Sequence, residues 1–556
     1  MNESLRVGFA QINPTVGAIK NNGGKMMDIL EEQNNYDLVV FPELSIVGYP
    51  PMDLLHHAEV IEAQEKVLEE IRGYTDVDSN PAVIVGCALE NNDGVLENLA
   101  VLVNNGNIKC RYAKQLLPTY DIFDEHRYFE PGSGACVAEV DGFRIGLSVC
   151  EDGWYDVESG GRRQHEYNPM AEFGDLDVDL VVNLSASPFH VQKTSERYTR
   201  FQKHADDADA PVLFVNQVGV NDEIVFDGGS FVTTAEGTMT RLESFKEDFG
   251  SVEIPNATDS IIDIGHIGVT RQIRRAVELG ISDYFKKTGF EEAIIGMSGG
   301  IDSSVTAVLA TNALGCDNVY GVMLPSAVTS DESIEDARAV AENLGIEFDV
   351  VDVTSAVGST DGILDNVEDR YGGVAYENIQ ARVRGVILMG LANSRDALVL
   401  TPDNKSEGGV GYCTLYGDTV GAIAPLGDLY KRSIYNLAYH FNGDSLTSEG
   451  SEVIPQSVIS KSPSAELREE QDDEDDIPPY DVIDSVLIDH VENTETVETV
   501  EEKYPDDMVD SITTRLRQSE FKRKQTPMPI RVTKKSFGRG WKYPVAADYD
   551  VIQTDD

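Results

Sequence analysis

The sequence predicts an α/β protein of two domains, each built on buried strands that alternate with helices. Two observations carry this prediction. Many of the Val, Ile and Leu residues stand in short continuous runs, which is typical of strands covered on both faces. Longer segments with helical spacing separate these runs, and strict alternation of strand and helix is typical of a parallel sheet. With 556 residues, the chain also exceeds the usual size of one domain.

The first predicted domain covers residues 1–262. Its expected strands lie at residues 6–12, 37–41, 82–89, 98–104, 144–150, 180–184 and 212–217. Helical spacing is found at residues 26–34 and 58–74. Residues 244–260 are polar and rich in turn-forming residues, so we expect a linker there.

The second predicted domain covers residues 263–556 and opens with a helical pattern from residue 269. Its expected strands lie at residues 293–297, 319–324, 348–353 and 397–400, and its clearest helices at 333–344 and 379–392. This order predicts a Rossmann-like parallel sheet with helices on both faces. Residues 466–476 are strongly acidic, which favours a solvated loop.

The charge of the chain is strongly negative: 97 acidic and 44 basic side chains give a net charge of −53. Such a chain does not bind nucleic-acid backbones or anionic membranes by general charge neutralisation. No apolar run is long enough to span a membrane, and no secretion signal is evident, so we expect a cytoplasmic protein. Because molar salt screens self-repulsion, we hypothesise a salt-loaded cytoplasm, the alternative being an acidic mesophilic protein.

Two local features stand out against this background. Residues 515–542 hold ten basic side chains and one acidic side chain, Glu520. We expect this basic tail to neutralise an anionic ligand. The alternative is a surface patch whose positive charge balances that of the acidic run.

The six cysteines include no CxxC pair and are expected to be mostly buried small hydrophobic residues.

Three side chains of the first domain form a possible amide-hydrolysing set. Cys150 ends a predicted strand and is followed by Glu-Asp-Gly-Trp, Glu43 stands in Phe-Pro-Glu-Leu, and Lys114 stands in Tyr-Ala-Lys-Gln-Leu-Leu-Pro. A carboxylate can take the thiol proton, and an ammonium can stabilise the oxyanion of a tetrahedral intermediate. Taken singly, each residue has a simpler structural explanation, because a lone cysteine after a strand is usually part of a core.

The order of these motifs resembles the nitrilase superfamily of amide-hydrolysing enzymes over residues 1–260. The resemblance implies an αββα sandwich for the first domain. It also implies Glu43 as general base, Lys114 as oxyanion support and Cys150 as the acylated nucleophile. Glu125 corresponds to a second glutamate that orients the site.

Members of that superfamily that use glutamine hold it with residues that correspond to Tyr120, Ser187 and Lys193. Residues 160–177 look like an insertion between Cys150 and the last two of these positions.

A glycine- and serine-rich loop follows the first strand of the second domain. It reads Gly296-Met297-Ser298-Gly299-Gly300-Ile301-Asp302-Ser303-Ser304, and it is not a Walker-type loop. Glycines permit close approach to a phosphate, and hydroxyls and a helix N-terminus supply donors. The motif resembles the pyrophosphate-binding loop of enzymes that split ATP into AMP and pyrophosphate. A Gly-Gly pair alone more often marks a simple turn.

Three further segments, residues 377–384, 403–431 and 462–468, resemble the NAD synthetase family. With the nitrilase-like half, the resemblance extends to its glutamine-dependent members over almost the full chain. It implies ATP and Mg²⁺, with Asp302 and Glu407 as metal ligands. The expected ATP or pyrophosphate contacts are residues 296–304, Thr401, Pro402 and Lys431. The expected deamido-NAD contacts are Asn378, Glu407, Tyr412, Asp418 and Lys522.

Two positions depart from the family pattern. Pro402 replaces a threonine that contacts ATP in the family, so Thr401 or the backbone is expected to make that contact. Trp541-Lys542 stands where the family has a basic pair.

The resemblance implies a two-site ligase. Glutamine is hydrolysed at Cys150, and its ammonia passes to deamido-NAD⁺ that ATP has activated. The family also implies a homo-oligomer. Two alternatives remain open: a fused amidase and ATP pyrophosphatase acting on another carboxyl acceptor, and a scaffold with inactive sites. The intact Glu43, Lys114 and Cys150 set argues against the scaffold.

Overall fold

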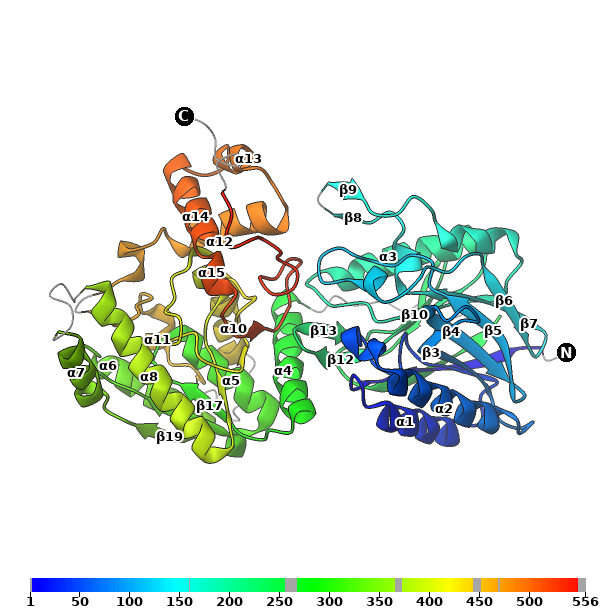
Figure 1. The fold of residues 1–556 in the computed structure, drawn as a ribbon, viewed down its shortest axis with the longest axis horizontal. Coiled ribbons are helices and arrows are strands. Elements are labelled where there is room, and N and C mark those ends of the chain that lie inside the picture. The colour runs from blue at the N-terminus through cyan, green and yellow to red at the C-terminus, as the bar shows by residue number, and fades with distance from the viewer. Residues whose placement is uncertain are drawn as a thin grey trace. The chain divides into compact units, whose positions relative to one another are not determined.

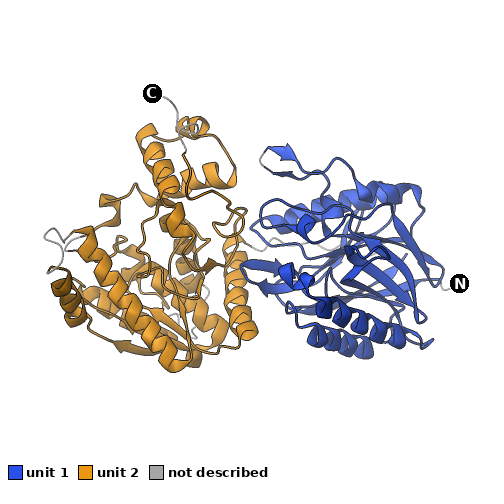
Figure 2. Cartoon of the chain, in the orientation of Figure 1, with its two compact units in different colours: residues 1–267 blue, residues 268–556 orange. Residues whose placement is uncertain are grey.

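The computed structural model describes residues 3–159, 161–255, 268–365, 373–443, 452–468 and 471–548. The chain divides into two compact units, Met1–Ile267 and Gly268–Asp556 (Figure 2). The predicted domain boundary between residues 262 and 263 lies outside the described residues. The two units are described separately below.

Unit 1 contains two six-stranded sheets that pack face to face (Figure 1). The first sheet has the order β16-β1-β2-β3-β4-β5, and the second has the order β15-β14-β11-β10-β7-β6. The first comprises β1 (Leu5–Gln11), β2 (Leu38–Val40), β3 (Ala82–Glu90), β4 (Leu96–Asn104), β5 (Asn107–Ala113) and β16 (Asp248–Ile254). The second comprises β6 (Cys136–Val140), β7 (Phe143–Val149), β10 (Leu180–Ser185), β11 (Val212–Asn216), β14 (Phe231–Thr234) and β15 (Gly237–Arg241).

Helices cover the outer faces of both sheets in unit 1. The helices α1 (Ile19–Glu32) and α2 (Ala58–Thr75) pack on the first sheet, and α3 (Lys193–Ala208) packs on the second. Two hairpins complete the unit: β12 (Val218–Asn221) with β13 (Ile224–Asp227), and β8 (Glu158–Ser159) with β9 (Arg162–Arg163). The predicted αββα sandwich is confirmed.

The structure corrects one expectation for unit 1 and adds one feature that the sequence did not predict. Residues 248–254 are not a linker but strand β16, which pairs antiparallel with β1 at the edge of the first sheet. An edge strand can keep polar side chains in water, so its composition resembles that of a loop. In addition, Cys110 and Cys136 form a disulfide between β5 and β6, with their Cα atoms 6.6 Å apart, whereas Cys87 and Cys150 are free and buried.

Unit 2 is built on one parallel sheet with the order β19-β18-β17-β20-β21-β22. The strands are β17 (Ala293–Gly296), β18 (Val319–Met323), β19 (Glu347–Val350), β20 (Leu398–Leu400), β21 (Ile423–Ala424) and β22 (Met528–Pro529). After β17 the chain adds strands on one side and then returns to the other side. The carboxyl end of β17 therefore lies at a topological switch point, where open α/β sheets bind ligands.

Helices surround this sheet in unit 2 (Figure 1). The helices up to residue 460 are α4 (Val269–Thr288), α5 (Ile301–Leu314), α6 (Asp331–Leu344), α7 (Thr354–Leu364), α8 (Val374–Arg395), α9 (Lys405–Val410), α10 (Lys431–Gly443) and α11 (Gln456–Ser460). A further apolar cluster involves α12 (Tyr480–Leu487), α13 (Val497–Glu501) and α14 (Asp506–Gln518), with the short α15 (Glu520–Arg523) following. In the described parts of the chain, no helix combines the length and apolarity that crossing a bilayer requires.

Candidate active sites

The candidate nucleophile of unit 1 stands at a sharp change of backbone direction. Cys150 directly follows β7 and begins the 3₁₀ helix Cys150–Trp154. Its φ of 40° lies in the left-handed region, which non-glycine residues rarely adopt. Such strain often marks a functional position, because surrounding structure must hold it in place.

A buried ion network contains the other predicted catalytic residues. Lys114 Nζ lies 2.9 Å from Glu43 Oε1 and 2.8 Å from Glu125 Oε1, and its side chain is 1% exposed. Asn98 Nδ2 and the Ala186 amide also donate to Glu43, at 2.7 and 2.8 Å. These contacts hold Glu43 and Glu125 on either side of one ammonium group.

Electrostatics link this network to the thiol. Burial raises the pKa of Cys150 well above its usual value, and Glu43 adds to the rise while Lys114 opposes it. Burial alone would lower the pKa of Lys114, but Glu125 and Glu43 raise it well above normal. The thiol is therefore neutral at pH 7 and needs a base to become a nucleophile.

The predicted glutamine-binding residues take two different positions. Tyr120 donates to Glu151 Oε1 at 2.8 Å, and Lys193 Nζ lies 3.4 Å from the centroid of the Trp154 ring. Both therefore contact the short helix that begins at Cys150. Ser187 is instead held in the interior, where its Oγ accepts from Arg197 Nε at 3.1 Å.

The sequence did not single out Glu151, Trp154 or Arg197. Arg197 is almost fully buried and forms an ion pair with Asp227 at 2.6 Å, so it anchors the Ser187 segment. Burial lowers the pKa of Lys193 to about 8, although Glu196 opposes the shift. The position of Glu151 and Trp154 in the Cys-Glu-Asp-Gly-Trp motif was the available signal.

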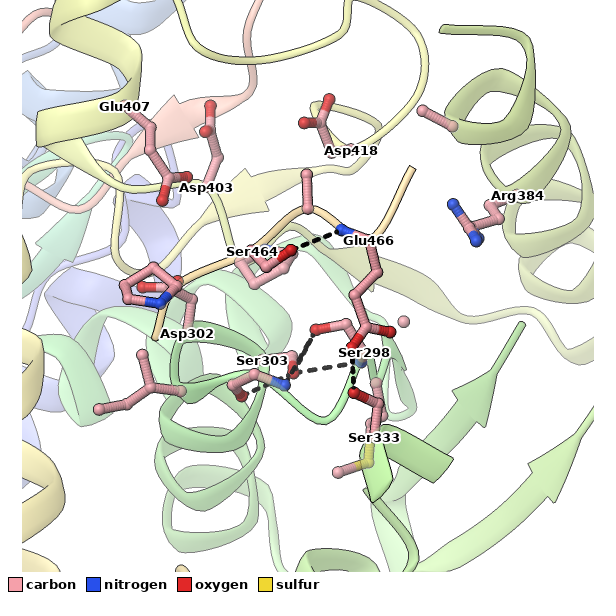
Figure 3. Close-up of a pocket in the computed structure, with 18 of the residues that line it drawn as sticks. Ser298, Asp302, Ser303, Ser333, Arg384, Asp403, Glu407, Asp418, Ser464 and Glu466 are labelled. Atoms are coloured by element: carbon pink, nitrogen blue, oxygen red, sulfur yellow. Dashed lines mark hydrogen bonds between the residues drawn. The ribbon is translucent and has the colours of Figure 1, made fainter. Parts of the chain in front are cut away.

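Unit 2 contains a cavity of about 260 Å³ around the carboxyl end of β17 (Figure 3). Many of the predicted nucleotide-site residues line it: Gly296, Met297, Ser298, Gly300, Ile301, Asp302, Ser303, Pro402, Glu407, Tyr412, Asp418 and Lys431. The other predicted residues are not among its lining: Gly299, Ser304, Asn378, Thr401 and Lys522.

The serine-glycine loop runs from β17 into α5, as the sequence predicts. Gly299 has a φ of 80°, and a Cβ there would lie 2.2 Å from the Ser333 carbonyl oxygen, so only glycine fits. The amides of Ser298 and Gly300 donate to Ser303 Oγ and Ser298 Oγ, each at 3.2 Å. Ser304 Oγ instead donates to the Gly300 carbonyl at 2.8 Å and stabilises the first turn of α5.

Lys431 bridges the two predicted metal ligands. Its Nζ lies 2.6 Å from Asp302 Oδ2 and 3.0 Å from Glu407 Oε1, and Tyr480 donates to the same glutamate oxygen at 3.0 Å. Burial raises the pKa of Asp302 to about 6, against the effect of Lys431. Among the described residues, no group of three or more His, Cys, Asp or Glu side chains is arranged to hold a metal ion.

Asp403 adds another carboxylate that the sequence did not single out (Figure 3). Burial raises the pKa of Asp403 well above normal, and the neighbouring carboxylates of Asp418, Glu407 and Asp302 add to the rise. The cavity therefore has a strongly acidic side, which suits a cationic or metal-bound ligand better than a bare anion.

Three further residues that are predicted to contact a ligand form hydrogen bonds beside the cavity. Asn378 Oδ1 accepts from Thr414 Oγ1 at 2.7 Å, and Thr401 Oγ1 donates to the Asp418 carbonyl at 2.6 Å. Lys522 Nζ donates to the Gly411 and Cys413 carbonyls, both at 2.7 Å. These bonds shape the 411–418 loop, which contributes Tyr412 and Asp418 to the cavity.

Side chains of the basic tail, residues 515–542, also form hydrogen bonds and ion pairs within unit 2. Arg523 pairs with buried Glu520 and donates to the Gly408 and Gly409 carbonyls, while Arg515 donates to the Asp476 carbonyl. Trp541, at the position where the family has a basic residue, is buried and donates to Glu520 Oε2 at 2.9 Å. These contacts give the local reversal of charge a structural role in unit 2.

The acidic run is also only partly solvated. Asp473 is 4% exposed and accepts from Tyr412 and Tyr480, at 3.1 and 3.0 Å. Residues 469–470 of the run lie outside the described residues.

The far end of the cavity contains residues that the sequence did not single out for binding. Arg384 donates to the Leu324 carbonyl at 2.9 Å and to Ser326 Oγ at 3.2 Å. Glu466 accepts from Ser333 Oγ at 2.6 Å and pairs with Lys461 at 3.0 Å (Figure 3). Arg384 thereby joins α8 to the segment that follows β18, and Glu466 joins the 462–468 segment to α6.

Comparisons with known proteins agree with this two-site organisation. Residues 6–261 match the carbon-nitrogen hydrolase family, and residues 273–526 match the NAD synthase family. The glutamine-dependent NAD(+) synthetase of Synechocystis sp. is 37% identical over 97% of this chain and 98% of its own length. That of Thermotoga maritima is 36% identical over 97% and 98%.

Solved structures of glutamine-dependent NAD+ synthetases are also similar to this chain in fold. The glutamine-dependent NAD+ synthetase of Acinetobacter baumannii, determined in complex with ADP, is 32% identical and has a TM-score of 0.77 over 98% of both chains. That of Cytophaga hutchinsonii, 21% identical with a TM-score of 0.84 over 99% of both, shares the fold. With its two family domains and full-length relatives, the chain belongs to the glutamine-dependent NAD(+) synthetase family.

Proposed function

We propose that this protein converts deamido-NAD⁺ to NAD⁺, with glutamine as nitrogen donor and ATP as activator. The observation that carries the proposal is the combination of two sites on one chain. A cysteine next to a buried Glu–Lys–Glu network lies in unit 1, and a serine-glycine loop at the switch point of a parallel sheet lies in unit 2.

In unit 1, Glu43 takes the thiol proton and Cys150 attacks the side-chain amide of glutamine. Lys114 stabilises the oxyanion of the tetrahedral intermediate, and ammonia leaves. Water then hydrolyses the thioester and releases glutamate. Glu125 orients Lys114 through their 2.8 Å contact.

In unit 2, the nicotinate carboxylate of deamido-NAD⁺ attacks the α-phosphorus of ATP and pyrophosphate leaves. Ammonia then attacks the activated carbonyl and displaces AMP, which gives NAD⁺. The serine-glycine loop, the N-terminus of α5 and Lys431 bind the phosphates. Tyr412 and Asp418 face the dinucleotide, and Asn378 and Lys522, which are also proposed to contact it, hold the loop that carries them.

The carboxylates of Asp302 and Glu407 would hold Mg²⁺. Both line the cavity, and oxygen ligands of this kind suit the ion, so the donor set fits. The ion would neutralise the charge that develops on the leaving pyrophosphate. Lys431 contacts both carboxylates and would keep them close enough together to share one cation.

Ammonia is the intermediate shared by the two reactions. Only its neutral form is nucleophilic, so we propose that it passes between the sites shielded from water. Protonation in bulk solvent would slow the second reaction and waste glutamine.

We also propose a homo-oligomer in the cytoplasm, without nucleic-acid or membrane partners. Val374 and Val386 on α8 are 69% and 73% exposed, and Met389 on the same helix is 40% exposed. Tyr416, in the loop that packs on α8 at Gly385, is 61% exposed. Side chains of this kind gathered on one helix suit the interface between two copies of unit 2.

One assay tests the proposed reaction. Purified protein receives ATP, Mg²⁺, glutamine and deamido-NAD⁺, and NAD⁺, AMP and glutamate are measured. All three should form in equal amounts. AMP formation with a different carboxyl acceptor only would favour the fused amidase and ATP pyrophosphatase, and no turnover with any acceptor would favour the inactive scaffold.

A further inference from the structure

A histidine in the insertion of unit 1 contacts the residue that follows the nucleophile. His165 Nε2 lies 2.9 Å from Glu151 Oε1. The same oxygen accepts from Tyr120 at 2.8 Å. The side chains of Glu151 and His165 are only 4% and 11% exposed, so water competes little for this contact. Either the Nε2-protonated neutral imidazole or the imidazolium can donate here.

The two donors leave one oxygen of Glu151 available. Within the described residues, its hydrogen bonds are these two, and both end on Oε1. Because Glu151 directly follows Cys150 in the 3₁₀ helix, Oε2 is a carboxylate oxygen without a protein donor beside the nucleophile. In a largely buried side chain such as Glu151, a charged donor from a ligand satisfies this oxygen well.

An ammonium group also contacts this short helix. Lys193 Nζ stacks on Trp154, and burial lowers the pKa of Lys193, while Glu196 and, to a smaller extent, Glu151 raise it. The turn after Cys150 therefore presents one carboxylate and one ammonium group. The head group of a free amino acid carries the complementary pair, an ammonium and a carboxylate.

We propose that His165 is a positioning residue for glutamine recognition. With Tyr120, it fixes Glu151 so that Oε2 receives the α-ammonium group of glutamine, while Lys193 faces the α-carboxylate. The inference rests on the proposed glutaminase activity of unit 1. Residues 160–177, which look like an insertion in the nitrilase pattern, thereby supply a specificity element for free glutamine.

The test compares glutamine with Nα-acetylglutamine, which lacks the α-ammonium group. In His165→Ala, kcat/KM for glutamine should fall about tenfold or more, mainly through KM. For Nα-acetylglutamine it should change little, so the preference of the enzyme for glutamine should shrink. His165→Gln keeps an N–H donor and should restore most of the preference, whereas Glu151→Gln, which removes the charge, should lose it.

Two controls keep the result interpretable. Ammonia-dependent NAD⁺ synthesis should be unchanged in every variant, and Glu166→Gln alters an exposed neighbour of His165. An unchanged preference in His165→Ala overturns the inference, as does an equal loss for both substrates, which indicates a purely structural role. If the wild-type protein makes no NAD⁺ from glutamine, the proposed function fails instead.

Discussion

Lys431 Nζ lies 2.6 Å from Asp302 Oδ2, and this contact joins the first residue of α10 to the first turn of α5. The two residues are 129 positions apart in the sequence. The contact brings a cation to the end of the serine-glycine loop, on the side of the cavity that carries the carboxylates of Asp302, Asp403, Glu407 and Asp418.

Lys431→Met should reduce ammonia-dependent NAD⁺ synthesis by about 10²-fold or more, because a preorganised cation beside the phosphates is lost. Steady-state assays with saturating ammonia, ATP and deamido-NAD⁺ measure the effect. Glutamine hydrolysis in unit 1 should persist, and Lys286→Met, on an exposed face of α4, is the matched control. Activity near the wild-type level would remove Lys431 from the proposed mechanism.

Cys150→Ala should abolish glutamine-dependent synthesis and leave ammonia-dependent synthesis intact, because the thiol acts only in the first reaction. NAD⁺ formation with each nitrogen donor is the measurement. Cys316→Ser changes an exposed cysteine of unit 2 and should leave both activities unchanged. Loss of both activities in Cys150→Ala, with an unchanged circular dichroism spectrum, would contradict two separable sites.

The KM for glutamine should rise above pH 8. Burial lowers the pKa of Lys193 to about 8, so the side chain is a cation below that pH and neutral above it. Its attraction for the α-carboxylate of glutamine is therefore lost as the pH rises through 8. Lys193→Arg should flatten the profile between pH 7 and 8.5, where the α-ammonium group of glutamine stays charged, since arginine stays charged as well. A wild-type KM that is constant over this range would exclude Lys193 from glutamine binding.

Lys405→Met should strongly destabilise unit 2. Lys405 and Asp428 are both fully buried, 2.9 Å apart, and Lys405 Nζ also donates to the Lys535 carbonyl. Removing one partner of such a pair leaves an uncompensated charge and costs about 3–5 kcal/mol. Urea unfolding should show the transition of unit 2 at lower denaturant, with that of unit 1 unchanged. A shift no larger than that of Lys286→Met would contradict this view of the pair.

The melting temperature should rise with KCl concentration. At a net charge of −53 the native state suffers self-repulsion, and molar salt reduces the Debye length to about 3 Å. Scanning calorimetry between 0.1 and 2 M KCl should show a gain of about 5 °C or more. A flat profile would favour the acidic mesophilic alternative.

Much of the fold and of the candidate sites was predictable from sequence. Buried strands such as β10 and β17 are continuous apolar runs, and the motifs around Cys150 and Ser298 are long enough to identify. Strand β16 was missed because an edge strand carries loop-like composition. Asp403 was missed because an aspartate beside a proline has no periodic pattern, and its importance comes from three carboxylates that the fold brings near it.

The sequence by itself determined the two α/β units, the family and the chemistry of the two motifs, because these depend on local runs of residues. Only the tertiary structure decided which partners the side chains around each site contact. In the structure, Lys522 and Arg523 donate hydrogen bonds to backbone carbonyls, and Thr401 donates to the Asp418 carbonyl. His165 contacts the carboxylate of Glu151. Partners such as these are far apart in the chain, and a hydrogen bond depends on distance and direction in space, which residue types and spacing do not encode.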